Sequence, residues 1–181
     1  MTKAFYERGW YGINIEPLPD KHKLLEIFRK RDINLQLGVG EKEGNTTFLV
    51  KGCYSSMLYD KTNNISKFIN IRVNTMSNIC RKFVPKDVKI EFVKIDVERA
   101  EKNVLLGFDF ENYRPKIFCI ESLFIPKTNI PEYKEWEPIL IRNDYVFAYN
   151  YGVNRFYYDK RLVGLRDKFN GIDFYAKFYK K

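Results

Sequence analysis

The chain has 181 residues, of which 45% are hydrophobic and 17% aromatic, so it can form a packed core and is neither intrinsically disordered nor of low complexity. Its length is that of one domain, and we expect residues 1–181 to form a single one. With 32 Lys and Arg against 23 Asp and Glu, the formal net charge is +9, which favours anionic partners without deciding the fold.

Short apolar runs alternate with amphipathic stretches along the chain, and this pattern predicts an α/β fold. Strands are expected at residues 11–15, 33–37, 46–51, 68–73, 90–95, 116–120, 145–149 and 155–158. Helices are expected at residues 2–8, 19–31, 75–81, 100–107, 133–143 and 159–169. The polar stretch at residues 52–67 is expected to be a loop.

The helix expected at residues 19–31 combines an apolar face with basic clusters. Its apolar face contains Leu24, Leu25, Ile27 and Phe28. The clusters at residues 21–23 and 29–31 are interpreted as solvent-exposed, and contact with a phosphate-bearing substrate or nucleic acid is the alternative. His22, the one histidine of the chain, is expected at the surface.

Carboxylates follow three of the expected strands. Glu16, Asp96 and Glu121 each come directly after a short apolar run. In open α/β sheets, ligands bind outside the carboxyl ends of the strands, so these acids are candidates for a binding site. The alternative for each of them is that it caps the following helix or faces water.

The cysteines favour a reducing compartment, and we expect the protein to be cytoplasmic. Cys53, Cys80 and Cys119 are widely spaced, and with one histidine they make no recognisable zinc site, so no metal is expected. No run is long and apolar enough to span a bilayer, and the N-terminus lacks the apolar core of a signal peptide.

Several stretches together resemble the FkbM family of S-adenosylmethionine-dependent methyltransferases. They are residues 9–17, 37–40, 93–101, 107–110, 114–115 and 154–157. The resemblance implies a class I methyltransferase fold, which is Rossmann-like, with a mostly parallel sheet whose last strand is antiparallel and helices on both faces. It also implies S-adenosylmethionine as the cofactor. By the same resemblance, Glu16 would bind the ribose of the cofactor and Asp96 would lie near its methionine end. Gly38 and Val39 would lie beside its adenine.

The resemblance also implies an activity. The protein would be an O-methyltransferase that acts on a hydroxyl group of a sugar, a polysaccharide or a small natural product. Asp96 and Glu98 would be the catalytic acids, since a carboxylate can accept the proton of the attacking hydroxyl. Glu121, Asn154 and Arg155 would lie on the substrate rim.

The sequence departs from the family pattern in two places. Arg99 stands where the family has glycine, a residue that permits close backbone approach or an unusual φ. The first strand and its glycine-rich turn have no counterpart, so we expect a sheet that lacks its first strand, impaired cofactor binding, and a homo-oligomer or a complementing N-terminal segment as partner.

Two other functions stay open. A non-catalytic methyltransferase remnant would bind a partner through the sheet edge left by the lost strand. A basic nucleic-acid-binding protein would explain the charge of +9, but the chain contains no recognisable module of that kind.

Overall fold

The computed structural model describes residues 2–50, 67–122, 124–125, 130–131 and 133–170. These residues form a mixed α/β structure that divides into two compact units. The first unit is Met1–Asp87 with Glu98–Phe108, and the second is Val88–Val97 with Asp109–Lys181. Most of the loop expected at residues 52–67 lies outside the described residues.

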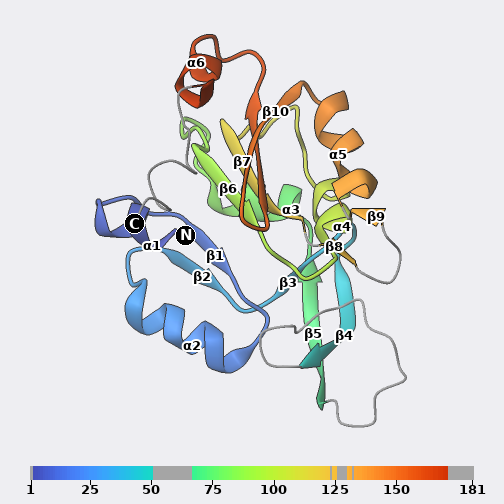
Figure 1. Ribbon diagram of the computed structural model, residues 1–181. Helices are drawn as coiled ribbons and strands as arrows, with labels where there is room; N and C mark the ends of the chain where they lie inside the picture. Colours follow the sequence, from blue (N-terminus) through green and yellow to red (C-terminus); the bar gives the residue numbers. More distant parts are fainter. Residues whose placement is uncertain (1, 51–66, 123, 126–129, 132, 171–181) are drawn as a thin grey trace, which may run out of the picture. The chain divides into compact units, whose positions relative to one another are not determined.

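Two small sheets and four helices make up the described part of the first unit (Figure 1). Its helices are α1 (Lys3–Glu7), α2 (Pro19–Phe28), α3 (Met76–Phe83) and α4 (Glu101–Leu106). Its strands are β1 (Ile13–Ile15), β2 (Ile33–Leu35), β3 (Gly38–Val39), β4 (Gly44–Val50) and β5 (Lys67–Asn74). β1 pairs with β2 in parallel, while β5 pairs with β3 in parallel and with β4 antiparallel. The strand expected at residues 33–37 is confirmed as the shorter β2, and Gly38 and Val39 just after it form β3 in a different sheet.

The core of the first unit lies against β5, whose apolar residues alternate as a half-buried strand requires. Ile71 and Val73 pack in one buried cluster with Leu18 and Phe48. Near α4 the backbone approaches closely, since a Cβ atom at Gly107 would lie 2.3 Å from the carbonyl oxygen of Gly40. Cys80, on α3, is also buried.

Helix α2 turns its apolar residues outward, contrary to the sequence pattern. Leu24, Ile27 and Phe28 are exposed, whereas His22 is buried, so the expectation of a surface histidine is wrong. His22 precedes Leu24 by two residues and so lies on nearly the opposite side of the helix, which is the buried side. Just beyond the helix, Arg29 pairs with the fully buried carboxylate of Asp32 at 2.6 Å, and Asp32 also accepts hydrogen bonds from the backbone N–H of Gly12 and from Asn14.

One four-stranded sheet organises the second unit (Figure 1). Its helices are α5 (Tyr133–Arg142) and α6 (Leu165–Asn170). Its strands are β6 (Phe92–Ile95), β7 (Ile117–Glu121), β8 (Phe124–Ile125), β9 (Ile130–Pro131), β10 (Tyr145–Tyr151) and β11 (Asn154–Asp159). The order in the sheet is β10-β11-β7-β6, with β6 parallel to β7 and β11 antiparallel to both of its neighbours.

The strand pairing is mixed over the described residues. β1–β2, β3–β5 and β6–β7 are parallel, and the remaining four pairs are antiparallel. The expected α/β fold is therefore confirmed. The expected mostly parallel sheet is not, because antiparallel pairs outnumber parallel pairs among the described strands. None of the described helices has the length and apolar character needed to cross a membrane.

Aromatic rings fill the core of the second unit. The rings of Phe118 and Tyr145 meet edge to face at 4.9 Å, and Phe110 lies 6.0 Å from each of them. The hydroxyl of Tyr145 donates a hydrogen bond to the carbonyl oxygen of Pro115 at 2.8 Å, so this buried polar group is satisfied. Cys119 is buried in the same strand as Phe118.

A buried ion pair anchors the end of β11. Arg114 donates to both carboxylate oxygens of Asp159, at 3.0 and 3.1 Å, and to the carbonyl oxygen of Asn143. Asp159 also binds Arg161, whose side chain is 58% exposed. The Arg-Pro pair at residues 114–115, which contributed to the family resemblance, therefore has a structural role.

We expect Arg114→Met to lower the free energy of unfolding by about 3 kcal/mol, because it leaves the carboxylate of Asp159 buried with one exposed partner. Arg161→Met is the matched control and should cost no more than about 1 kcal/mol, as exposed ion pairs do. Urea denaturation of both variants measures the difference. Equal losses in the two variants would contradict this account.

Candidate functional site

The register of the second unit's sheet brings polar residues from three strands into one row. β6 and β7 are parallel with Ile95 opposite Ile120, so the next residues along the two chains, Asp96 and Glu121, are neighbours. Across the antiparallel pair, Glu121 lies opposite Asn154 of β11. Because directly opposed residues of neighbouring strands point to the same face, the three side chains meet at one end of the sheet.

Lys94 connects this row. It precedes Asp96 by two residues on the same strand and therefore points to the same face. Its ammonium nitrogen lies 3.1 Å from Asp96 Oδ2, and it donates hydrogen bonds to Asn154 Oδ1 at 2.6 Å and to the carbonyl oxygen of Ile95. The Lys94 side chain is only 16% exposed, so its charge acts in a partly desolvated place.

The surroundings of Asp96 favour its ionised form. Partial burial alone would raise its pKa, but a side-chain hydrogen bond with Glu121 and the charge of Lys94 outweigh that effect, and the pKa lies below its ordinary value of 3.8. Asp96 is thus a carboxylate prepared to accept a further hydrogen bond.

Cys119 lies beside Lys94 in the sheet register, but its thiol is a poor nucleophile. Burial raises the pKa of its thiol to about 11, which keeps it protonated at neutral pH. The chemistry available on this face therefore comes from the carboxyl groups.

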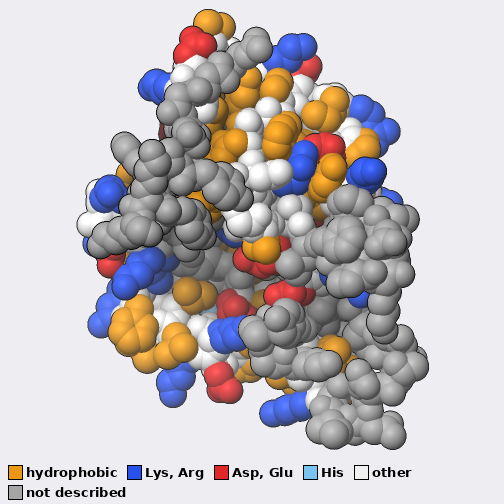
Figure 2. Space-filling view, in the orientation of Figure 1, with side chains coloured by type: hydrophobic (Ala, Val, Ile, Leu, Met, Phe, Trp, Pro, Cys, Tyr) orange, Lys and Arg blue, Asp and Glu red, His pale blue; other side chains and the backbone are white. Residues whose placement is uncertain are grey.

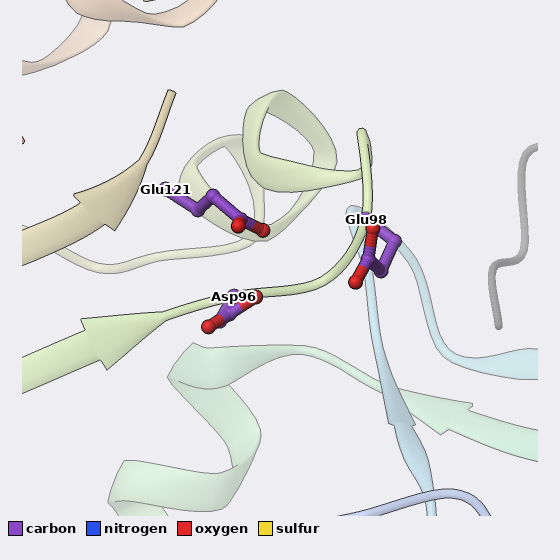
Figure 3. Close-up of side chains that lie close together, drawn as sticks. All are labelled: Asp96, Glu98 and Glu121. Carbon is purple, nitrogen blue, oxygen red and sulfur yellow. The ribbon is translucent and has the colours of Figure 1, made fainter. Parts of the chain in front are cut away.

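Glu98 follows Asp96 by two residues, on the segment that leaves β6. One carboxylate oxygen from each of Asp96, Glu98 and Glu121 lies within 4.8 Å of the others (Figure 3). Acidic groups at such separations are common without a bound ion, and we assign no metal to them. The backbone here is left-handed, with φ of 52° at Glu98 and 81° at Arg99.

The backbone at Arg99 has a φ that favours glycine. A Cβ atom carries a steric cost at such a φ, and glycine has none. Of the two properties of glycine considered for this position, close approach and unusual φ, the φ of 81° corresponds to the second.

The two residues of β11 expected on the substrate rim lie on opposite faces of the sheet. Asn154 joins Asp96 and Glu121, whereas Arg155 points to the opposite face of the sheet. There Arg155 donates hydrogen bonds to the hydroxyl of Tyr157 at 2.7 Å and to Glu137 of α5 at 2.8 Å, and its guanidinium lies 3.7 Å from the ring centre of Tyr133. These contacts indicate that Arg155 fastens α5 to the sheet.

The residues expected to bind the cofactor's ribose and adenine lie in the first unit. Glu16 follows β1, and its Oε1 accepts a hydrogen bond from the backbone N–H of Leu18 at 2.9 Å, just before α2. This is the capping role weighed as the alternative for an acid after a strand, and it leaves the carboxylate with other acceptor positions. Gly38 and Val39 form the short, buried strand β3 beside β5.

Sequence reasoning missed the role of Lys94. The signal was present, because in a strand residues i and i+2 share a face and Lys94 stands two positions before Asp96. Its second partner, Asn154, is 60 residues away and becomes a neighbour only through the sheet order.

We expect Lys94→Met to raise the pKa of Asp96, because the variant removes the neighbouring positive charge. A pH titration of the Asp96 side-chain carboxyl carbon by NMR measures this directly. The lowered pKa stabilises the fold above the ordinary pKa of aspartate, and this contribution is lost as the pH falls through the folded-state value. Lys94→Met should weaken that acid dependence, whereas the control Lys116→Met, which removes an exposed partner of Glu91, should leave Asp96 unchanged.

We expect Arg99→Gly to be more stable than Arg99→Ala by about 1 kcal/mol. Both variants lose the arginine side chain with its contacts, so their difference isolates the cost of a Cβ atom at a φ of 81°. Chemical denaturation of the two variants provides the measurement. If the alanine variant were as stable as the glycine variant, the left-handed backbone at this position would be refuted.

Comparison with known proteins identifies a family. Residues 1–147, well over half of the chain, match the Methyltransferase FkbM domain family. No curated protein and no solved structure matched the sequence. The family match includes β6, Asp96, Glu98 and Glu121, and it ends within β10. The chain therefore belongs to the FkbM methyltransferase family.

Proposed function

We propose that this protein is an S-adenosylmethionine-dependent O-methyltransferase whose acceptor is a hydroxyl group of a sugar, a polysaccharide or a small natural product. The chain belongs to a methyltransferase family, and we propose which cofactor and which acceptor it uses. The observation that carries it is the row of Asp96, Glu121 and Asn154 at the carboxyl end of parallel strands β6 and β7, with Asp96 held ionised by Lys94.

The chemistry of this row suits methylation of an alcohol. The attacking hydroxyl oxygen must lose its proton as the new C–O bond forms, and a positioned carboxylate can accept that proton. Asp96 accepts it in our proposal. Asn154 and Glu121 would orient the acceptor, because each offers hydrogen-bonding atoms on the same face as Asp96.

The residues also fit the expected cofactor in charge. When bound, S-adenosylmethionine supplies an electrophilic methyl group on a positively charged sulfonium. Asp96 and Glu98 are acids that complement this charge, and Glu16 has acceptor positions for ribose hydroxyl groups. We also propose that the adenine lies beside Gly38 and Val39, which form the short strand β3.

We further propose that the two units belong to one class I methyltransferase domain over residues 1–181. The parallel pairs β1–β2 and β6–β7 and the antiparallel last strand β11 support this arrangement. Among the described strands, β1 pairs only with β2 and β6 only with β7, which leaves a place for a further strand beside each. A complementing N-terminal segment or another copy of the chain would supply it, and we place the protein in the cytoplasm.

The proposal is tested by measuring cofactor binding and methyl transfer separately. We expect S-adenosylmethionine to bind in isothermal titration calorimetry and its labelled methyl group to pass to hydroxylated acceptors in a panel of sugars and glycosides. Asp96→Asn should lower the transfer rate by about 100-fold or more while the fold is retained, since it removes the proton acceptor. Glu91→Gln changes an acid at the opposite end of β6 and should leave the rate unchanged.

Two results would count against this function. The absence of both cofactor binding and methyl transfer would favour the non-catalytic alternative. Cofactor binding with equal transfer rates in the wild type and Asp96→Asn would retain the enzyme but remove Asp96 as its base.

A further inference from the structure

The outward side of α2 is apolar, and methyl transfer makes no use of it. Leu24 is 53% exposed, Ile27 49% and Phe28 69%, although these residues make up most of the helix's apolar material. A helix on the surface of a globular protein normally turns such residues toward the core. Here the inward side carries His22, and Leu24, Ile27 and Phe28 face outward.

The three apolar residues form one stripe with basic borders. Ile27 and Phe28 follow Leu24 by three and four residues, so all three lie together on one side of the helix. Lys23 precedes Ile27 by one turn and Lys21 precedes Phe28 by about two turns, so an ammonium group borders the stripe on each side. Both lysines are exposed.

Positive charge predominates around the stripe. Figure 2 shows hydrophobic side chains over α2 with Lys and Arg side chains around them. The exposed cations are Lys21, Lys23, Lys30 and Arg31, the last of which also stacks on Tyr6. Of the two acids of the helix, Asp20 precedes Leu24 by four residues and lies on the side of the stripe in the first turn, whereas Glu26 lies away from it.

We propose that α2 binds the anionic surface of a lipid bilayer. Leu24, Ile27 and Phe28 enter the boundary between headgroups and acyl chains, and the lysines bind lipid phosphates. Exposed apolar side chains with lysines beside them suit an anionic lipid surface, because the side chains can enter its apolar boundary while the ammonium groups stay at the phosphates. A protein partner fits less well, because lysine is depleted at protein–protein interfaces.

Co-sedimentation with lipid vesicles tests this proposal on the full chain. We expect binding to vesicles of phosphatidylcholine mixed with phosphatidylglycerol, much weaker binding to phosphatidylcholine alone, and a decrease with added salt. The double variant Leu24→Ser, Phe28→Ser should lower the partition coefficient about tenfold or more, because it removes two inserted side chains. Val163→Ser removes a fully exposed apolar residue of the second unit and should change nothing.

A second pair of variants separates charge from apolar insertion. The double variant Lys21→Gln, Lys23→Gln keeps the apolar stripe. It should weaken binding to the anionic vesicles and leave the weak binding to phosphatidylcholine vesicles unchanged. Circular dichroism checks that all variants are folded, which their exposed positions favour.

Three outcomes would overturn the proposal: no binding of the wild type to anionic vesicles, equal binding of the Leu24→Ser, Phe28→Ser variant, or a dimer in solution that Phe28→Ser dissociates without any vesicle binding. The last outcome would show that a second copy covers the stripe. None of these measurements needs cofactor or acceptor, so their failure is distinct from failure of the methyltransferase proposal.

Discussion

The parallel pairing of β6 with β7 is the constraint on which the site depends. Parallel strands end at the same edge of a sheet, and this register sets Asp96 beside Glu121. Two carboxylates so placed repel each other when both are ionised. The side-chain hydrogen bond with Glu121 and the ammonium group of Lys94, 3.1 Å from Asp96, keep the pKa of Asp96 below its ordinary value despite partial burial. Asp96 is therefore ionised at neutral pH, the state in which a carboxylate can accept a proton.

Strand β11 links this site to the rest of the second unit. Its first residue, Asn154, is bound by Lys94, and its last residue, Asp159, is bound by Arg114. Between them, Arg155 and Tyr157 face away from the acids and form hydrogen bonds with Glu137 of α5. One strand therefore carries the site on one face and the attachment of a helix on the other. Its antiparallel direction matters, because it brings the N-terminal end of β11 to the carboxyl end of β7.

The sequence predicted the elements whose pattern is local. The strand expected at residues 68–73 corresponds to β5 (Lys67–Asn74), and the helix expected at residues 133–143 corresponds to α5 (Tyr133–Arg142). The acids after the strands were also found, because a carboxylate behind an apolar run is visible in the sequence. Of the two properties of glycine considered at position 99, close approach and unusual φ, the structure shows an unusual φ at Arg99.

Features that depend on tertiary pairing were not predictable. The break between β2 and β3 requires knowing which strand each will join. The outward apolar side of α2 was missed because periodicity shows which residues share a helix face but not which face the fold buries. Lys94 acquired a role only when the fold brought Asn154 beside it.

Two cysteines in the described part of the chain are buried and provide internal reporters of opening. Cys80 lies in the first unit and Cys119 in the second, and each is almost fully shielded from solvent. A thiol with a pKa of about 11, such as that of Cys119, reacts slowly with alkylating reagents even where water reaches it, so burial and low thiolate content both protect it. In a chain with Cys53 substituted, the labelling rates of the two thiols would follow the opening of each unit separately. Similar rates would indicate that the units unfold as one cooperative body, whereas different rates would show that one of them opens independently.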